Sequence, residues 1–257
     1  MNHRLNVLIS ALTLFFGFLL PHLTYAEPAP ASAWTEPKTG MQFVWIPTGC
    51  FNMGGDESVD GQPIHKVCVK GFWIGRYEVT QEQYQQVMGS NPSNSQGPTK
   101  PVESVNMDEV SSFVEEMSFS TGTKVRLPSE AEWEYACRAG GAHEKYCAGG
   151  GRPDRMAWYE SNSGKETHPV GQLAANDWGL YDMSGNVWEL MQDCWNDNYT
   201  GAPVDGSAWK TGDCGRRVLR GGSWLNIPTF LRAADRVSFD TSNSYLNVGF
   251  RVARSQP

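Results

Sequence analysis

The first half of the chain contains short runs whose spacing is typical of strands. Residues 43–46 and 72–74 are aromatic or aliphatic throughout, and apolar and polar residues alternate over 65–69. Runs of this length that are rich in β-branched and aromatic residues, and bounded by Gly or Pro, favour extended structure. We therefore predict strands over these three segments.

Three further segments carry a helix-start signal followed by apolar residues three or four positions apart. In a capping box, a polar side chain and a Gln or Glu three positions later satisfy each other's backbone N–H groups. The pattern occurs at three places: Thr80 with Gln83, Asn106 with Glu109, and Ser129 with Glu132. We predict a helix after each, the second ending at Gly122 and the third at Gly140.

From residue 141 onward the chain is rich in Gly, Asn, Asp and Trp and has few periodic stretches. A long irregular region is uncommon unless it is functional or held together by cross-links or ions. We therefore expect this half to carry the functional site.

The N-terminal segment reads as an export signal. Arg4 precedes an apolar run over 5–20, and Thr24-Tyr25-Ala26 approximates a cleavage site with small residues. We predict a signal peptide over 1–26, a flexible lead-in over 27–39, and one domain over 40–257. The protein is then periplasmic or secreted, with no membrane span left after cleavage.

Export changes the interpretation of the six cysteines. In an oxidising compartment an even number of cysteines favours disulfides. Six cysteines allow fifteen pairings. We favour pairing along the chain: Cys50 with Cys68, Cys137 with Cys147, and Cys194 with Cys214.

The charge balance excludes one class of partner. The chain has 21 Lys and Arg against 28 Asp and Glu, a formal net charge of −7. Because nucleic-acid binding needs clustered cations to neutralise phosphates, we expect no nucleic-acid partner.

Several collinear motifs resemble the formylglycine-generating enzyme family, also called sulfatase-modifying factors. The most specific are Gly179-Leu-Tyr-Asp-Met-Ser-Gly-Asn-Val-Trp-Glu, Val218-Leu-Arg-Gly-Gly-Ser-Trp and Gly249-Phe-Arg. Earlier segments over 43–49, 77–80, 101–102 and 126–136 also match. The resemblance covers about residues 43–252 and implies an α+β fold similar to C-type lectins, with little regular structure and a surface groove beside the Gly-Gly-Ser segment.

True formylglycine-generating enzymes hold copper with two thiolates that follow the Gly-Gly-Ser segment. Here the matching positions are Asn226 and Leu231, or Thr229 or Phe230 if the alignment has a gap, and no cysteine follows Cys214. Amide and aliphatic side chains cannot hold Cu(I), which prefers soft sulfur ligands. The chain therefore departs from the family pattern at the two copper-ligand positions, and we expect that it binds no copper.

The resemblance also implies a calcium site in the turn over 182–189. In the family, backbone carbonyls at the positions of Asp182, Gly185 and Val187 join a carboxylate at the position of Glu189. Calcium takes six to eight oxygen ligands, so such a turn can hold it. The alternative is a helix cap by Asp182 with Glu189 exposed. A second family site near 157–170 departs from the pattern, because Trp158 stands where an Asn is expected.

Other candidate pocket residues come from the same resemblance. Trp188 and Ser223 fall on positions that line the family's oxygen-side pocket, with core and turn roles as the alternatives. Arg220, Arg232, Asp235 and Arg236 surround the Gly-Gly-Ser segment and could form the floor of a polar groove. A structural salt-bridge network is the alternative, since Arg is the usual buried partner of carboxylates.

Three functions follow from these residues. The first is an exported family member without the copper cysteines that acts on or binds a peptide or siderophore-like substrate, similar to periplasmic pyoverdine-maturation proteins. The second is a non-catalytic lectin-like module that binds a peptide, glycan or protein, with Trp195, Trp209 and Trp224 either on a binding face or in the core. The third is a true sulfatase-modifying oxidase. The sequence does not decide whether the protein is an enzyme.

Overall fold

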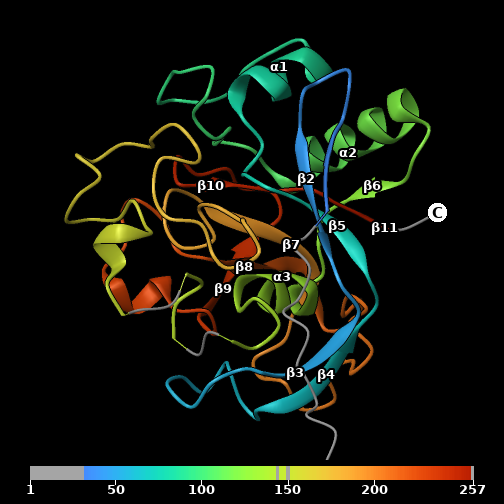
Figure 1. Cartoon of the computed structure of the whole chain (residues 1–257), viewed down its shortest axis with the longest axis vertical. Helices are drawn as coiled ribbons and strands as arrows, with labels where there is room; N and C mark the ends of the chain where they lie inside the picture. The colour runs from blue at the N-terminus through green and yellow to red at the C-terminus, as the bar shows by residue number, and fades with distance from the viewer. Residues whose placement is uncertain (1–31, 143–144, 149–150, 256–257) are drawn as a thin grey trace, which may run out of the picture.

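A five-stranded sheet forms one wall of the molecule (Figure 1). The computed structural model describes residues 32–142, 145–148 and 151–255. The strands lie in the order β1 (Ala33–Thr35), β2 (Gln42–Ile46), β5 (Phe72–Gly75), β11 (Ala253–Ser255) and β6 (Val125–Arg126), and each pairs antiparallel with its neighbours. The sheet therefore joins both ends of the described chain, as the C-terminal label beside β11 shows in Figure 1.

A two-stranded hairpin continues from this sheet. The hairpin consists of β3 (Gly49–Met53) and β4 (His65–Val69), paired antiparallel. Cys50 and Cys68 lie opposite each other in its register and are joined by a disulfide. The strands predicted over 43–46, 65–69 and 72–74 are all confirmed.

The second half of the chain builds a separate four-stranded sheet, which the sequence did not predict. Its order is β10 (Val248–Gly249), β7 (Trp188–Trp195), β8 (Asp213–Arg220) and β9 (Arg236–Asp240). Strand β7 is buried at nearly every position. A strand covered on both faces shows no alternation of apolar and polar residues, so its sequence resembled irregular structure.

Three α-helices accompany the sheets: α1 (Gln81–Met88), α2 (Met107–Thr121) and α3 (Glu130–Cys137). All three predicted capping boxes are present. Helix α2 ends before Gly122 in the left-handed conformation, as expected. Helix α3 ends at Cys137, and Arg138 is its C-cap, so the predicted end at Gly140 was too late. Two short 3-10 helices are η1 (Pro153–Arg155) and η2 (Pro228–Leu231).

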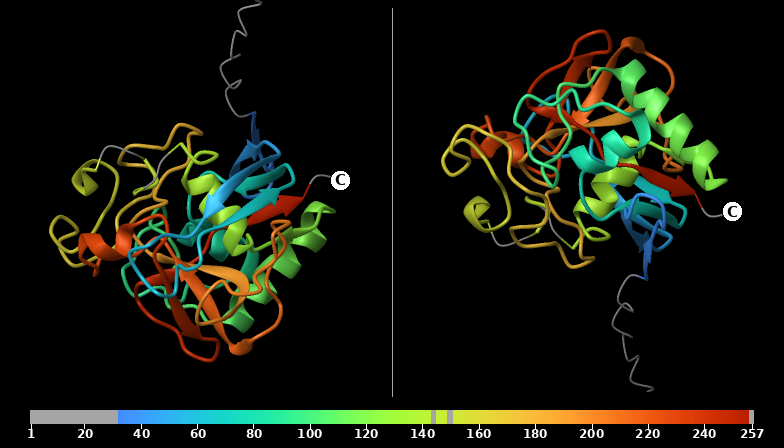
Figure 2. Two further views of the ribbon diagram at one scale, coloured as in Figure 1. Left: turned by 90° about the horizontal axis from the view of Figure 1, so that it is seen from below. Right: turned by 90° about the horizontal axis from the view of Figure 1, so that it is seen from above.

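The core has two main parts. One part packs α3 between the hairpin, the five-stranded sheet and β7, around the fully buried Trp133. The other packs α1 and α2 against the sheets, where Phe113 stacks on Tyr84 and meets Phe250 edge to face. Figure 2 shows α2 running along one side of the molecule next to the sheets. The irregular loops over 151–187 lie on the opposite side.

All three predicted disulfides form: Cys50–Cys68, Cys137–Cys147 and Cys194–Cys214. Part of the predicted lead-in over 27–39 makes ordered contacts. Ala33–Thr35 pairs with β2, and the Glu36 carboxylate accepts from the backbone N–H groups of Lys38 and Thr39. The signal peptide predicted over 1–26 lies outside the described residues. Within the described part of the chain, every helix is too short or too polar to cross a bilayer.

Candidate functional site

The Gly-Gly-Ser segment turns sharply directly after β8. Gly221 and Gly222 have φ of 95° and 76°, and a Cβ on Gly222 would lie 2.7 Å from the carbonyl oxygen of Phe230. Only glycine fits such a left-handed position against another backbone. The turn buries Ser223 completely and directs 224–230 along the surface.

Ser223 contacts only amide groups. Its Oγ donates to Asn226 Oδ1 at 2.6 Å and accepts from Asn247 Nδ2 at 3.1 Å. An activated serine needs a general base such as an imidazole, a carboxylate or a lysine amine. Among the described residues, the hydrogen-bond partners of Ser223 Oγ are the amides of Leu225, Asn226 and Asn247, so this serine is an anchor between two loops.

Exposed apolar side chains are found on the loops around Ser223. They lie on two loops that Ser223, Asn247 and the hydrogen bond from Trp224 Nε1 to the Leu246 carbonyl hold side by side. Their side chains are 36–49% exposed: Leu225, Ile227, Phe230, Tyr245 and Leu246. We call these five residues the Ser223 face. Exposed apolar groups gathered in this way are typical of binding surfaces.

The candidate Trp residues are structural for the most part. Trp188 is 4% exposed and belongs to the core around α2, with its ring 6.4 Å from that of Phe230. Trp195 and Trp224 are 7% and 8% exposed, and Trp209 packs partly against the core. Of these four, Trp188, through Phe230, and Trp224, through the Leu246 carbonyl, contact residues of the Ser223 face.

Arg220 and Arg236 are not a groove floor but members of a buried ion network. Arg220 is fully buried and contacts Glu134, and Arg236 forms a bidentate pair with Glu130 at 2.7 and 2.9 Å. Both carboxylates project from α3. Burial would raise the pKa of Glu130, but Arg236 and Arg220 hold it below its ordinary value.

The remaining charges of this network complete what we call the α3 cluster. Arg138 pairs with Glu134 at 2.8 Å. Asp193 accepts from the backbone N–H of Glu130 at 2.8 Å, and burial raises its pKa to about 7. The cluster thus contains three acids and three arginines: Glu130, Glu134, Asp193, Arg138, Arg220 and Arg236.

Arg232 and Asp235 lie beside the loop before β4, and the Asp235 carbonyl accepts from Arg220 Nη1 of the α3 cluster at 2.8 Å. Arg232 contacts Glu57 in a partly exposed ion pair, and both it and Asp235 line a cavity of about 10 Å³ with Ser58. Burial raises the pKa of Asp235 to about 6, and its Oδ2 has no hydrogen-bond partner among the described residues. No hydrogen bond or ion pair among the described residues joins the Asp235 carboxylate to Trp188 or Ser223.

The turn predicted to hold calcium is buried, and Glu189 is not exposed. Both Glu189 oxygens accept hydrogen bonds from Arg251 at 2.6 Å, and Oε2 also accepts from Trp133 Nε1 at 2.8 Å. Two donors fill the lone pairs of Oε2, whereas Oε1 keeps one free. The described residues contain no group of three or more His, Cys, Asp or Glu able to hold a metal. The predicted calcium set combines backbone carbonyls with Glu189, so a bound ion would have to share the Glu189 carboxylate with Arg251.

Two other buried carboxylates accompany Glu189. Asp182 accepts from the Gly171 N–H at 2.7 Å, so it is no helix cap, and burial raises its pKa to about 6. Glu78 accepts from Asn186 and from the Val187 N–H, and burial raises its pKa well above the ordinary value, with the charges of Asp182 and Glu189 adding to the effect. We call these three acids, with Arg251, the Glu78 cluster.

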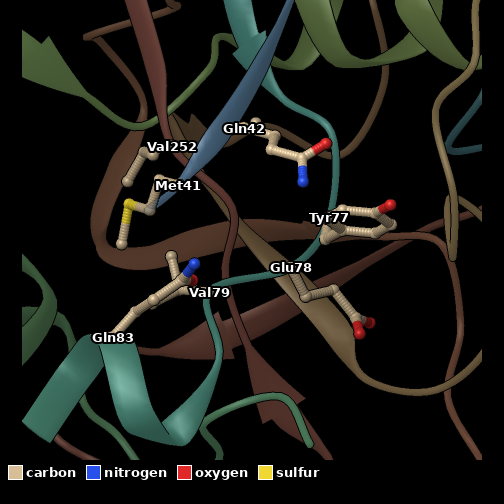
Figure 3. A pocket seen from close by; sticks show the side chains of 8 residues that line it. Met41, Gln42, Tyr77, Glu78, Val79, Gln83 and Val252 are labelled. Carbon is tan, nitrogen blue, oxygen red and sulfur yellow. The ribbon is translucent and has the colours of Figure 1, made fainter. Parts of the chain in front are cut away.

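Figure 3 shows the side chains around a small cavity next to Glu78. A cavity of about 10 Å³, the size of one water, lies between Met41, Gln83 and Val252. The Glu78 carboxylate points away from this cavity toward the interior. Glu78 itself is among the residues that line the cavity.

The loop of the second family calcium site is organised by an aromatic pair. Trp158 stacks on His168 with ring centroids 3.8 Å apart and planes 13° from parallel. The imidazole Nε2 lies 2.7 Å from the Ser163 carbonyl, and Asn186 bonds the backbone of His168. The departure at Trp158 thus coincides with a packing contact that orders the loop.

The residues that the sequence did not single out are the partners of the arginines. Glu130 and Glu134 were assigned only to a helix start, and Glu78 and Arg251 were read only as parts of motifs. Four charged residues of one motif, 126–136, are buried or half-buried. The signal in the sequence that could have indicated their burial was the number of charged residues close to Trp133, which was predicted to face inward.

Thiol chemistry is absent from the whole chain, because all six cysteines are in disulfides and none is free. The site therefore offers a buried polar anchor, an apolar face and no activated nucleophile at Ser223. This arrangement is suited to holding a ligand at the surface.

Comparisons with known proteins agree with the motifs. The model of the sulfatase-modifying factor enzyme 1-like domain matches residues 29–256. The chaperone protein LppX of Paenibacillus barcinonensis is 30% identical over 241 residues, which cover 74% of this chain and 82% of LppX. The formylglycine-generating enzyme of Mus musculus is 26% identical, with 89% of this chain and 80% of that protein covered.

Two solved structures share the fold. PvdO from Pseudomonas aeruginosa superposes with a TM-score of 0.80 at 33% identity, covering 90% of this chain and all of PvdO. Treponema denticola variable protein 1 superposes with a TM-score of 0.81 at 28% identity, covering 89% of this chain and all of that one. The α+β fold expected from the motifs is confirmed.

Proposed function

The chain belongs to the family of the sulfatase-modifying factor enzyme 1-like domain, and on that premise we propose that it is an exported member that binds a segment of another exported protein at the Ser223 face. The observation that carries the proposal is the group of five exposed apolar side chains on the loops around Ser223. An extended peptide with apolar side chains is the ligand that such a face suits.

Two features support binding over the copper oxidation of formylglycine-generating enzymes. Asn226 and Leu231 occupy the positions of the copper thiolates, and no free cysteine exists elsewhere in the chain. A relative at 30% identity carries the name of a chaperone, which is a protein that acts on another protein.

The lack of copper-dependent oxidation is tested with a Cys-x-Pro-x-Arg peptide. The purified protein is incubated with the peptide, with and without copper, and the peptide mass is followed. We expect no conversion to the aldehyde. Aldehyde formation with stoichiometric copper bound would establish the oxidase alternative instead.

Binding is tested by selecting displayed heptapeptides on the wild-type protein. Selected peptides should bind Ile227→Asp at least about tenfold more weakly, because the charge disrupts an apolar contact. Phe119→Asp, at an 87% exposed position on α2, is the matched control and should bind as the wild type does. Peptides that fail to enrich, or that bind both variants equally, would exclude the Ser223 face.

A siderophore-like substrate is the second candidate. It is supported by the motif resemblance to pyoverdine-maturation proteins and by the 33% identity with PvdO. A change in mass of a peptide-based siderophore precursor, incubated with the protein, would favour this alternative.

Export and calcium complete the proposal. The sequence of 1–26 and the three disulfides support a periplasmic or secreted location. Calcium in the turn over 182–189 would add positive charge beside the Glu78 cluster, in which Arg251 is the single cation for three buried acids. Its role here is structural.

A further inference from the structure

A second cavity lies on the surface away from the Ser223 face. It has a volume of about 400 Å³ and is open to solvent. Ligand pockets in proteins are commonly about 300–1,000 Å³. Its lining comes from four parts of the chain, and the residues used below are Arg126, Ser129, Glu132, Gln192, Gly206 and Lys210. We call it the Gln192 groove.

The floor of the Gln192 groove is held rigidly. Ser129 Oγ donates to the Gly206 carbonyl at 2.7 Å, and the Gln192 N–H donates to the Pro128 carbonyl at 3.1 Å. Gly206 has φ of 76°, and a Cβ there would lie 2.8 Å from Val69 Cγ1. The loop, the start of α3 and β7 are therefore fixed relative to one another before any ligand arrives.

Strand β7 and the disulfide beside it hold the remaining wall. The Trp209 N–H donates to Asp193 Oδ1 at 2.7 Å, and the Cys194 N–H donates to the Trp209 carbonyl at 2.8 Å. The Cys194–Cys214 disulfide closes the loop that carries Lys210. Lys210 is thus an exposed side chain on a tethered backbone.

The charged residues that line this groove are Arg126, Glu132 and Lys210, two cations and one acid, in a protein whose net charge is −7. Arg126 and Glu132 neutralise each other in a bidentate pair at 2.6 and 2.7 Å. Behind the wall, Arg217 Nη1 donates to the Gln192 carbonyl at 2.9 Å. The ammonium of Lys210 has no ion pair or hydrogen bond with a described residue.

Two acidic side chains near the groove, Asp205 and Asp193, accept hydrogen bonds from other protein groups. Asp205 accepts from the hydroxyl and N–H of Ser207. Asp193 is 5% exposed, and its two oxygens accept from backbone N–H groups of Glu130 and Trp209. The side-chain amide of Gln192 makes no hydrogen bond with any described residue, so it can donate to a ligand beside Lys210.

We propose that the Gln192 groove binds a carboxylate group, with the Lys210 ammonium as the charge partner and the Gln192 amide as the second donor. The carboxylate can belong to a small organic acid or to an acidic side chain of a peptide, since both present the same oxygens. The site is separate from the Ser223 face and does not depend on the function proposed there.

The test uses nuclear magnetic resonance of the purified full-length protein. The Gln192 side-chain amide is assigned from its loss in Gln192→Leu. Two probes are titrated separately: tricarballylate, and an uncharged-ended pentapeptide that alternates Gly and Glu. We expect a saturable shift of the Gln192 amide with at least one probe, weakened by added salt because the contact is exposed.

Charge reversal at Lys210 distinguishes a site from general anion attraction. Lys210→Glu should weaken binding about tenfold, whereas Lys165→Glu, an exposed lysine elsewhere, should change the dissociation constant less than about twofold. Both positions are exposed, so both variants should fold. Saturation by tricarballylate alone identifies a small acid as ligand, and saturation by the peptide alone identifies an acidic segment. No saturable shift with either probe, or equal weakening by the two variants, would overturn the proposal.

Discussion

The α3 cluster and the Glu78 cluster both bury charge, but only one of them is balanced. In the α3 cluster three acids face three arginines, all at most 6% exposed. In the Glu78 cluster three acids, all at most 4% exposed, share Arg251 alone. Removing an ion from water costs several kcal/mol, which a partner must offset.

The difference shows in how each cluster is neutralised. In the α3 cluster the arginines hold the pKa of Glu130 low, whereas burial raises the pKa of Asp193, whose two oxygens accept from backbone N–H groups, to about 7. In the Glu78 cluster burial raises the pKa values of Glu78 and Asp182, so the excess negative charge favours a proton or a cation. The first cluster is a structural joint between α3 and the four-stranded sheet, and the second is the place where a bound ion would matter.

The largest effect is expected from breaking the balanced cluster. Glu134→Gln leaves Arg220 and Arg138 without their shared carboxylate, and unpairing a buried charge typically costs about 3–5 kcal/mol. Urea unfolding should show this loss. The exposed Glu82→Gln on α1 is the control and should change stability by less than about 0.5 kcal/mol. Similar stabilities for the two variants would mean that the cluster carries no net pairing energy.

Calcium removal tests the acid-rich cluster. A ligand present at about 100 times its dissociation constant stabilises the folded state by about 2.7 kcal/mol. For a chain of this size we expect a chelator to lower Tm by about 5–10 °C. Thermal unfolding with and without chelator measures it, and an unchanged Tm would remove calcium from the proposal. Glu189→Gln should abolish the response to the chelator.

The pH dependence of the acid-rich cluster is the next smaller effect. Asp182 has a folded-state pKa of about 6, above its ordinary 3.8, so the folded state holds a proton that the unfolded state has released. Its contribution to stability therefore increases as pH falls, by about 1 kcal/mol between pH 7 and pH 5, and is lost as pH rises through 6.

Asp182→Asn isolates this contribution. Asn tolerates the φ of 55° at this position and can still accept from the Gly171 N–H. In chelator, the gain in unfolding free energy between pH 7 and pH 5 should be smaller in the variant than in the wild type. Identical pH profiles would show that Asp182 is ionised throughout.

The smallest effect is expected outside both clusters. The Arg232–Glu57 pair has side chains 24% and 51% exposed, and solvent screens such pairs. Arg232→Gln should therefore change the free energy of unfolding by less than about 1 kcal/mol, as measured in urea. A loss of unfolding free energy as large as that of Glu134→Gln would show that burial does not determine how much an ion pair contributes to stability.

Local signals in the sequence determined much of this protein. The three capping boxes, the three early strands and the three disulfides were all predictable, because each depends on residues close together in the chain. The family motifs determined the fold class for the same reason, since each motif is a short contiguous run.

Only the tertiary structure decided which charges are partners. Arg236 meets Glu130 across 106 positions of the chain, and Arg251 meets Glu189 across 62. Strand β7 likewise became recognisable only in the fold, where both core parts pack against it, because a strand buried on both faces lacks an alternating pattern. Spacing along a chain reports contacts within one helix or strand, whereas burial of charge depends on which distant elements close over it.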